Sequence, residues 1–299
     1  MVSYRDYLQR ENYAKTTVTS YLRCQFLFTE WCEQKNHESQ AIDYKSCVAY
    51  IKHLQRSKKG KTISKSTINH QIGALKIYFN YLIDQEERFE NPIQNINIRG
   101  VKRTLNHNLL EFEELEDLYY SYKTERIEFP SSPSVAIRNK VITGFMVYQG
   151  LNTTALKSLT VDNIQLEKGT LYIPSTRKTN SRTLELKSWQ ILPLVQYLEK
   201  HRELLQEELK NHTQALFPLN SDRFDIITLH LFKKLKRSNH KVTNLKQIRA
   251  SVITNWLTTY NIREVQYMAG HRYISSTERY LQDDLENLHE LIENSHPIS

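Results

Sequence analysis

Apolar residues recur at helical spacing along most of this chain, and residues that break helices are scarce. Glycine and proline number only 7 each in 299 residues, which disfavours a turn-rich β fold. The spacing predicts helices over residues 15–34, 44–56, 66–84, 112–122 and 135–149. Three short β-like segments follow, near residues 162–166, 170–173 and 182–186, and the pattern is helical again from residue 188. A mainly α fold with a small three-stranded antiparallel sheet is therefore expected.

The pattern also divides the chain into three parts. Residues 1–90 predict a bundle of about four helices, and residues 109–299 predict an α+β domain. Asn91-Pro92 ends the last helix of the bundle, and the polar residues that follow show no period, so residues 91–108 are interpreted as a linker. The three cysteines lack metal-ligand spacing, which indicates buried reduced thiols and a cytoplasmic protein. No apolar run approaches the ~20 residues of a membrane span.

Positive charge is concentrated in the N-terminal third. Residues 1–108 hold 17 lysines and arginines against 10 acidic residues, whereas residues 109–299 hold 24 against 23. Double-stranded DNA is the first candidate partner, because each neutralised phosphate releases condensed counterions. The residues assigned to DNA contact lie between two predicted helices and in the linker: Lys52, Arg56, Lys58, Lys59, Lys61, Lys65, Arg99, Lys102 and Arg103. The first six are equally compatible with a solvated loop.

The residues suited to catalysis gather near the C-terminal end. Lys246 and Arg249 are three apart in a predicted helix and project from one face. A later helix is expected to end at Gly270, with His271 in the turn that follows. Tyr280 lies in the first turns of a further helix. Each residue alone is more typical of a structural role, so the information lies in their joint order.

This joint order resembles the signature of the tyrosine recombinase (phage integrase) family. Residues 270–280, Gly-His-Arg-Tyr-Ile-Ser-Ser-Thr-Glu-Arg-Tyr, are similar to its Gly-His…Thr-x-x-Tyr motif, and Lys246-Gln-Ile-Arg249 is similar to its His/Lys-x-x-Arg box. Lys178 lies between the second and third β-like segments, where that family carries its catalytic lysine. The resemblance covers nearly the whole chain and implies a helical core-binding domain, a linker and a mixed catalytic domain.

One segment departs from the family pattern. Residues 150–156, Gly-Leu-Asn-Thr-Thr-Ala-Leu, resemble the Gly-Leu-Arg-x-x-Glu-Leu box, but Asn152 replaces the arginine and Ala155 replaces the glutamate. Losing both avoids a stranded buried carboxylate, and is compatible with a tolerated replacement or with decay of activity. Arg138 is too far along its helix to fill the gap. Three other arginines are candidates to fill it: Arg177, Arg182 and Arg272. Alternatively, Asn152 itself could donate a neutral hydrogen bond.

The resemblance implies strand cleavage by transesterification. The Tyr280 phenolate would attack a backbone phosphate, form a 3′-phosphotyrosine and release a 5′-hydroxyl. Arg249 would clamp the nonbridging oxygens bidentately, with a hydrogen bond from His271 and positive charge from Lys246. Lys178 would protonate the leaving oxygen. With these cations, no metal or other cofactor is required.

The favoured hypothesis is therefore an active site-specific DNA recombinase or integrase. The alternatives are a DNA-binding recombinase relative with impaired cleavage that acts beside an active partner, and a helical protein with no nucleic-acid role. The C-terminal tail carries Leu285, Leu288, Leu291 and Ile292 at helical spacing. This stripe packs on its own domain or, as the resemblance implies, docks on a neighbouring protomer in a tetramer on DNA.

Overall fold

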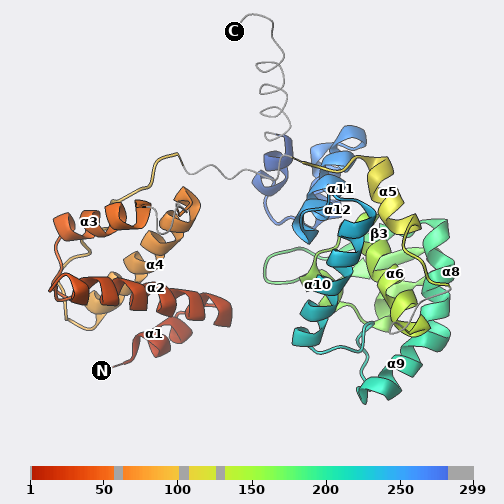
Figure 1. Ribbon diagram of the computed structural model, residues 1–299, viewed down its shortest axis with the longest axis horizontal. Helices are drawn as coiled ribbons and strands as arrows, with labels where there is room; N and C mark the ends of the chain where they lie inside the picture. Colours follow the sequence, from red (N-terminus) through yellow and green to blue (C-terminus); the bar gives the residue numbers. More distant parts are fainter. Residues whose placement is uncertain (1, 57–62, 101–107, 126–131, 282–299) are drawn as a thin grey trace, which may run out of the picture. The chain divides into compact units, whose positions relative to one another are not determined.

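The protein divides into two compact units, each described by itself. A computed structural model describes residues 2–56, 63–100, 108–125 and 132–281. Packing contacts group Met1–Arg103 in one unit and Thr104–Ser299 in the other (Figure 1). The described elements are mostly helices, with one three-stranded sheet, so the predicted mainly α fold is confirmed. Over the described ranges, no helix has the length and apolarity needed to cross a bilayer.

Four helices build the described part of the N-terminal unit. They are α1 (Tyr4–Arg10), α2 (Lys15–Gln34), α3 (Tyr44–Gln55) and α4 (Lys65–Asp84). Asp43 begins α3 by accepting the Ser46 N–H, and Ser64 begins α4 by accepting the Thr67 N–H. The three predicted helices of this unit are confirmed to within a residue at each end, and the short α1 lies before them.

Aromatic rings fill the core of this unit. Phe28 packs edge-on against Tyr50 and Phe79, with ring centroids 5.1 and 5.7 Å apart. Ile93 is buried in the same core, so the first residues of the predicted 91–108 linker fold with this unit, whereas residues 101–107 lie outside the described ones. The three cysteines are buried and free, as expected for reduced thiols: Cys24, Cys32 and Cys47.

The C-terminal unit is built around one apolar helix, α6 (Pro133–Val147). Most of its residues are buried, because apolar side chains lie all round it rather than on one stripe. It packs against α5, α8, α9 and α11. The other helices are α5 (Phe112–Tyr120), α7 (Thr153–Ser158), α8 (Ser188–Gln196), α9 (Arg202–Leu209), α10 (Ser221–Ser238), α11 (Leu245–Thr259) and α12 (Ile262–Ala269). Short 3₁₀ turns span Val161–Asn163 and Leu166–Lys168, and a π-helical turn spans Tyr197–His201.

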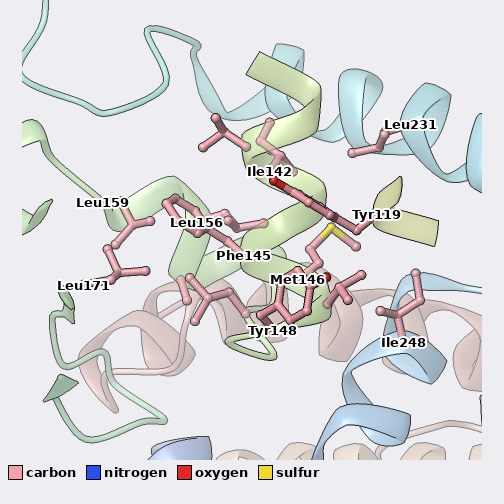
Figure 2. Packing of buried hydrophobic residues seen from close by; sticks show 14 of the residues in the cluster. Tyr119, Ile142, Phe145, Met146, Tyr148, Leu156, Leu159, Leu171, Leu231 and Ile248 are labelled. Atoms are coloured by element: carbon pink, nitrogen blue, oxygen red, sulfur yellow. The ribbon is translucent and has the colours of Figure 1, made fainter. Parts of the chain in front are cut away.

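The core around α6 joins elements that are far apart in the sequence. Figure 2 shows Ile142, Phe145 and Met146 of α6 among side chains from α5, α7, α10, α11 and the sheet. Ile248 of α11 is fully buried in this cluster. Arg249, the next residue, is half-buried at the edge of this core and donates to the carbonyl of Gly150, just after α6.

The sheet has the order β1-β2-β3, and both pairs are antiparallel. Its strands are β1 (Ile164–Gln165), β2 (Thr170–Ile173) and β3 (Arg182–Glu185), so the predicted three-stranded sheet is confirmed with shorter strands. In β3 the side chains alternate, so that Arg182 and Leu184 are buried while Thr183 and Glu185 are exposed. A charged side chain therefore shares the apolar face of this strand.

Candidate active site

Arg249 is held by backbone carbonyls from two different loops. Its guanidinium donates to the carbonyl of Gly150, which follows α6, and to the carbonyl of Ala269 at the end of α12, at 2.8 Å for the second. Burial lowers the pKa of Arg249, and the nearby Tyr280 offsets only part of this decrease. The guanidinium remains charged at any physiological pH, and its orientation is set by these two bonds.

The turn after α12 carries His271. Gly270 ends the helix in the left-handed conformation, with φ 69°, as predicted. Nδ1 of His271 lies 2.9 Å from the Thr277 hydroxyl, and Nε2 lies 3.5 Å from a guanidinium nitrogen of Arg249. Burial lowers the pKa of His271 to about 4, and repulsion from Arg249 and Arg182 adds to this effect. The ring is therefore neutral at neutral pH.

Tyr280 reaches the same place from the helical residues that begin at Ser275. Its ring stacks on that of His271, with centroids 5.9 Å apart and planes at 15°. The ring also packs on a small apolar cluster formed by Ile253, Val265 and Ala269. The structure thus brings Arg249, His271 and Tyr280 of one chain together. These residues lie on different segments, because helix α12 and the turns on either side of it separate α11 from Tyr280.

The loop between β2 and β3 is pinned beside the turn that follows α12. The Asn180 N–H donates to the Gly270 carbonyl at 3.0 Å, and the Arg272 guanidinium donates to the Thr176 carbonyl at 3.0 Å. Lys178 lies within this loop, its N–H donating to the Thr176 hydroxyl at 3.2 Å and its side chain exposed. The backbone therefore places Lys178 next to the segment that carries the histidine.

Lys246 lies one turn before Arg249 on α11, with an exposed side chain. It lines a surface hollow together with Thr153 of α7 and Asp225 of α10. The helical spacing correctly gives its position on α11, and its part in the site remains a prediction.

Asn152 is occupied as a helix cap. Its side-chain oxygen accepts the Ala155 N–H at 2.8 Å and so begins α7. Ala155 is buried, with 4% of its surface exposed. A glutamate there without its arginine would be a buried unpaired carboxylate, which is costly. The two departures from the family box are therefore structurally consistent with each other.

The basic residues assigned to DNA contact fall into two groups. Lys52, Arg56, Lys65 and Arg99 are described and exposed. Lys52 lies in the last turn of α3 and Lys65 begins α4, so these two belong to helices that border the predicted basic loop. The others lie outside the described residues: Lys58, Lys59, Lys61, Lys102 and Arg103.

The site as a whole places positive charge and hydrogen-bond donors around a phenol. An oxyanion that approached the phenol would meet the Arg249 guanidinium and the His271 ring, an arrangement that stabilises negative charge. Within the residues that the structure describes, no group of three His, Cys, Asp or Glu side chains is placed to hold a metal ion.

This fold and this phenol-centred site define a recombinase of the tyrosine type. The phage integrase family model matches residues 108–287, and the model of the phage integrase N-terminal SAM-like domain matches residues 1–87. The chain therefore belongs to the phage integrase family, an enzyme family, as its resemblance to that signature predicted.

Individual relatives agree with this assignment. Tyrosine recombinase XerC of Bacillus pumilus is 24% identical over 302 residues, covering 98% of this chain and 94% of the relative. Tyrosine recombinase XerA of Pyrococcus furiosus is 25% identical over 296 residues, covering 97% and 91%. Among solved structures, XerH site-specific recombinase bound to its difH substrate in a pre-cleavage complex has a TM-score of 0.70 at 19% identity, covering 97% of this chain and 84% of that one. The likeness to XerH shows a shared fold.

We expect His271 to stay neutral in the free protein at any pH above about 5. Because its pKa is lowered to about 4 from 6.5, the folded protein binds this proton less readily than the unfolded chain. The free energy of unfolding should therefore fall as the pH drops from 6.5 toward 4, and this contribution is fully present above 6.5. An NMR titration of the imidazole signal that is missing in His271→Gln measures the midpoint. A midpoint at or above 6.5 would contradict the burial and repulsion described here.

Proposed function

We propose that this chain is an active site-specific DNA recombinase that cleaves and rejoins DNA through Tyr280. The observation that carries the proposal is the stacking of the Tyr280 ring on His271 at 5.9 Å, beside the half-buried Arg249, whose guanidinium is oriented by two backbone carbonyls. All three side chains come from one chain, so the nucleophile serves the site of its own protomer. XerH, which shares the fold, has been solved with its difH substrate before cleavage, and the Tn1549 transposon integrase, with a TM-score of 0.61, has been solved with a circular intermediate DNA; both support double-stranded DNA as the substrate.

Cleavage is a transesterification in which one phosphodiester replaces another. The Tyr280 oxygen attacks the phosphorus, the bond to the 5′ oxygen breaks, and the 3′ end remains joined to the tyrosine. Negative charge grows on the nonbridging oxygens, where Arg249 donates from a fixed orientation. The 5′ hydroxyl of a second strand then attacks the phosphotyrosine by the reverse route. The bond energy is conserved in the covalent intermediate, so no ATP is consumed.

His271 acts as a neutral hydrogen-bond donor to the same phosphate. In the free protein Nε2 lies 3.5 Å from a guanidinium nitrogen of Arg249 and can only accept from it, so the ring proton is on Nδ1 and points at the Thr277 hydroxyl. When a phosphate takes up the Arg249 donor, the Thr277 hydroxyl donates to Nδ1 instead, and the proton on Nε2 is directed at the phosphate. A neutral ring adds a donor without adding a further positive charge beside the guanidinium. Lys246 contributes charge from the exposed surface of α11, and Lys178 on the β2–β3 loop gives a proton to the leaving 5′ oxygen.

Contact with the DNA backbone is assigned to the basic residues of the N-terminal unit and the chain that follows it. The described members, Lys52, Arg56, Lys65 and Arg99, are all exposed. Exposed cations that each neutralise a phosphate make binding fall steeply with salt concentration. The alternative function, a relative with impaired cleavage, is favoured by Asn152 and Ala155 alone, and it predicts salt-dependent DNA binding without covalent chemistry.

The phenylalanine variant Tyr280→Phe should abolish covalent attachment to DNA while leaving DNA binding unchanged. On a nicked suicide duplex the wild type should form an SDS-resistant protein–DNA adduct, visible as a shifted band in a denaturing gel, because the 5′ end diffuses away after cleavage. Tyr273→Phe is the matched control, since Tyr273 is 73% exposed and lies seven positions away. A wild type that binds DNA with steep salt dependence but never forms the adduct would establish the impaired-cleavage alternative.

Lys178→Ala should slow cleavage of ordinary DNA by ~10²–10⁴-fold, the usual contribution of a general acid. The loss should nearly vanish on a substrate whose leaving 5′ oxygen is replaced by sulfur, because a thiolate with a pKa near ~8.5 leaves without a proton. Rates of adduct formation on the two substrates measure this. Lys168→Ala, an exposed lysine in the preceding turn, is the control. An equal loss on oxygen and sulfur substrates would exclude proton donation by Lys178.

Deletion of residues 285–299 should prevent assembly of a tetramer on DNA while sparing binding of a single protomer. The deleted stripe of leucines would otherwise dock on a neighbouring copy, and it lies outside the described residues. Native gel shifts and mass photometry on a duplex with two binding sites measure the stoichiometry. Deletion of residues 295–299, which keeps the stripe, serves as the control. Unchanged tetramer assembly without residues 285–299 would refute this role.

A further inference from the structure

We propose that Arg182 supplies the positive contact to the scissile phosphate that Asn152 no longer provides. Arg182 lies on β3, outside the motifs that define the family signature in this chain. The inference rests on the proposed function and adds to it a residue that binds the reacting phosphate. Three observations support this role: the position of the buried Arg182 guanidinium against Gly270, its Nε without a hydrogen-bond partner among the described residues, and its proximity to Arg249.

The Arg182 guanidinium lies against the turn that carries His271. A Cβ added to Gly270 would lie 2.9 Å from Cζ of Arg182, so the glycine leaves the space that the guanidinium occupies. Two contacts fix this arrangement, because the Tyr267 hydroxyl accepts the Thr183 N–H at 3.0 Å and Asn180 bonds to the Gly270 carbonyl. Strand β3 and the end of α12 are thus joined by hydrogen bonds from residues on either side of Arg182 in the sequence.

Among the residues that the structure describes, none gives this buried guanidinium an anionic partner. Arg182 is 2% exposed, its Nε makes no hydrogen bond to any residue that the structure describes, and its one bond, to the Asn180 carbonyl, is long at 3.4 Å. The charged neighbour is another cation, Arg249, and burial followed by this repulsion lowers the pKa of Arg182 to about 10. Burying a charge without a counter-ion is costly, and placing two together is more so. The pair is arranged as a receptor for an oxyanion that is absent from the free protein.

The other two candidate arginines are placed differently. Arg272 is exposed, and its guanidinium already donates to the Thr176 carbonyl at 3.0 Å, which pins the β2–β3 loop. Arg177 is exposed within that same loop. Arg138 is buried at a different place, where its neighbours are Tyr197, Tyr122 and Glu208. Arg182 alone among these four combines burial with direct proximity to Arg249 and His271.

Asn152 and Arg182 together account for the altered family box. The Asn152 side chain caps α7, and the carbonyl two residues before it, that of Gly150, accepts from Arg249. An arginine at position 152 would place a further positive charge two residues from the carbonyl that orients Arg249. The strand arginine makes this further charge unnecessary, and the Asn152 oxygen is free to serve the helix.

The test compares Arg182→Met with the wild type on two suicide substrates. One carries an ordinary scissile phosphate, and the other a methylphosphonate, in which a neutral methyl group replaces one nonbridging oxygen. Adduct formation by Arg182→Met should be slower by ~10²–10³-fold on the phosphate, the usual cost of one such donor, and by less than ~10-fold on the methylphosphonate, where less charge needs neutralising. The urea midpoint of the free variant should equal or exceed that of the wild type, because a buried unpaired charge has been removed.

Arg263→Met is the matched control, since Arg263 is an exposed arginine on α12 whose bond is to Gln266. It should cleave both substrates at the wild-type rates. Arg182 is refuted as a phosphate ligand if Arg182→Met cleaves the phosphate as fast as the wild type. It is equally refuted if the variant unfolds at lower urea and loses the same factor on both substrates, which is the behaviour of a structural arginine. A wild type that forms no adduct refutes the proposed function instead, and with it this role.

Discussion

Two guanidinium groups close enough to repel each other, those of Arg182 and Arg249, and without a carboxylate partner among the described residues, are the constraint on which the site in the C-terminal unit depends. Such an arrangement is unfavourable in the free protein, and it persists only because the surroundings hold it. The carbonyls of Gly150 and Ala269 orient Arg249, and the Gly270 turn and β3 enclose Arg182. In the proposed mechanism an incoming phosphate offsets this repulsion, so that the feature that costs stability in the free state provides affinity for the transition state.

The surroundings can hold this arrangement because one close-packed core joins α6, α11 and the sheet, which carry or orient Arg249 and Arg182. Helix α6 is apolar on all sides, and the side chains packed on it come from α5, α7, α10, α11 and the sheet. The turn that follows α6 supplies, at Gly150, one of the two carbonyls that orient Arg249. His271 stays neutral for the same reason, because a positive charge on its ring would be repelled by both guanidinium groups. Close packing transmits small displacements, so the geometry of the site depends on this core.

Local signals in the sequence were sufficient for the helices, for the glycine that ends α12 and for the order of the three strands. The alternation of β3 also places Arg182 on the face of Leu184, a signal that points to burial. What could not be predicted are relations between distant segments. Nothing local to Ile93 says that it packs on the N-terminal bundle, and nothing local to Arg182 says that Gly270 lies against it. The motif marks Asn152 as the position of a missing arginine, whereas its side chain caps the start of a helix, a common role for asparagine.

The changes at Asn152 and Ala155 are therefore better explained by a positive charge supplied from another position than by the loss of that charge. A charged pair at positions 152 and 155 would need the carboxylate to be buried next to an arginine that also serves the phosphate. In this chain position 155 is a buried alanine that packs in the core, and position 152 satisfies a backbone donor of α7. Neither substitution leaves an unpaired charge, which random decay of one partner would have done. The cation that has no anionic partner among the described residues is Arg182 on β3, and it is the residue to which we assign the contact with the phosphate.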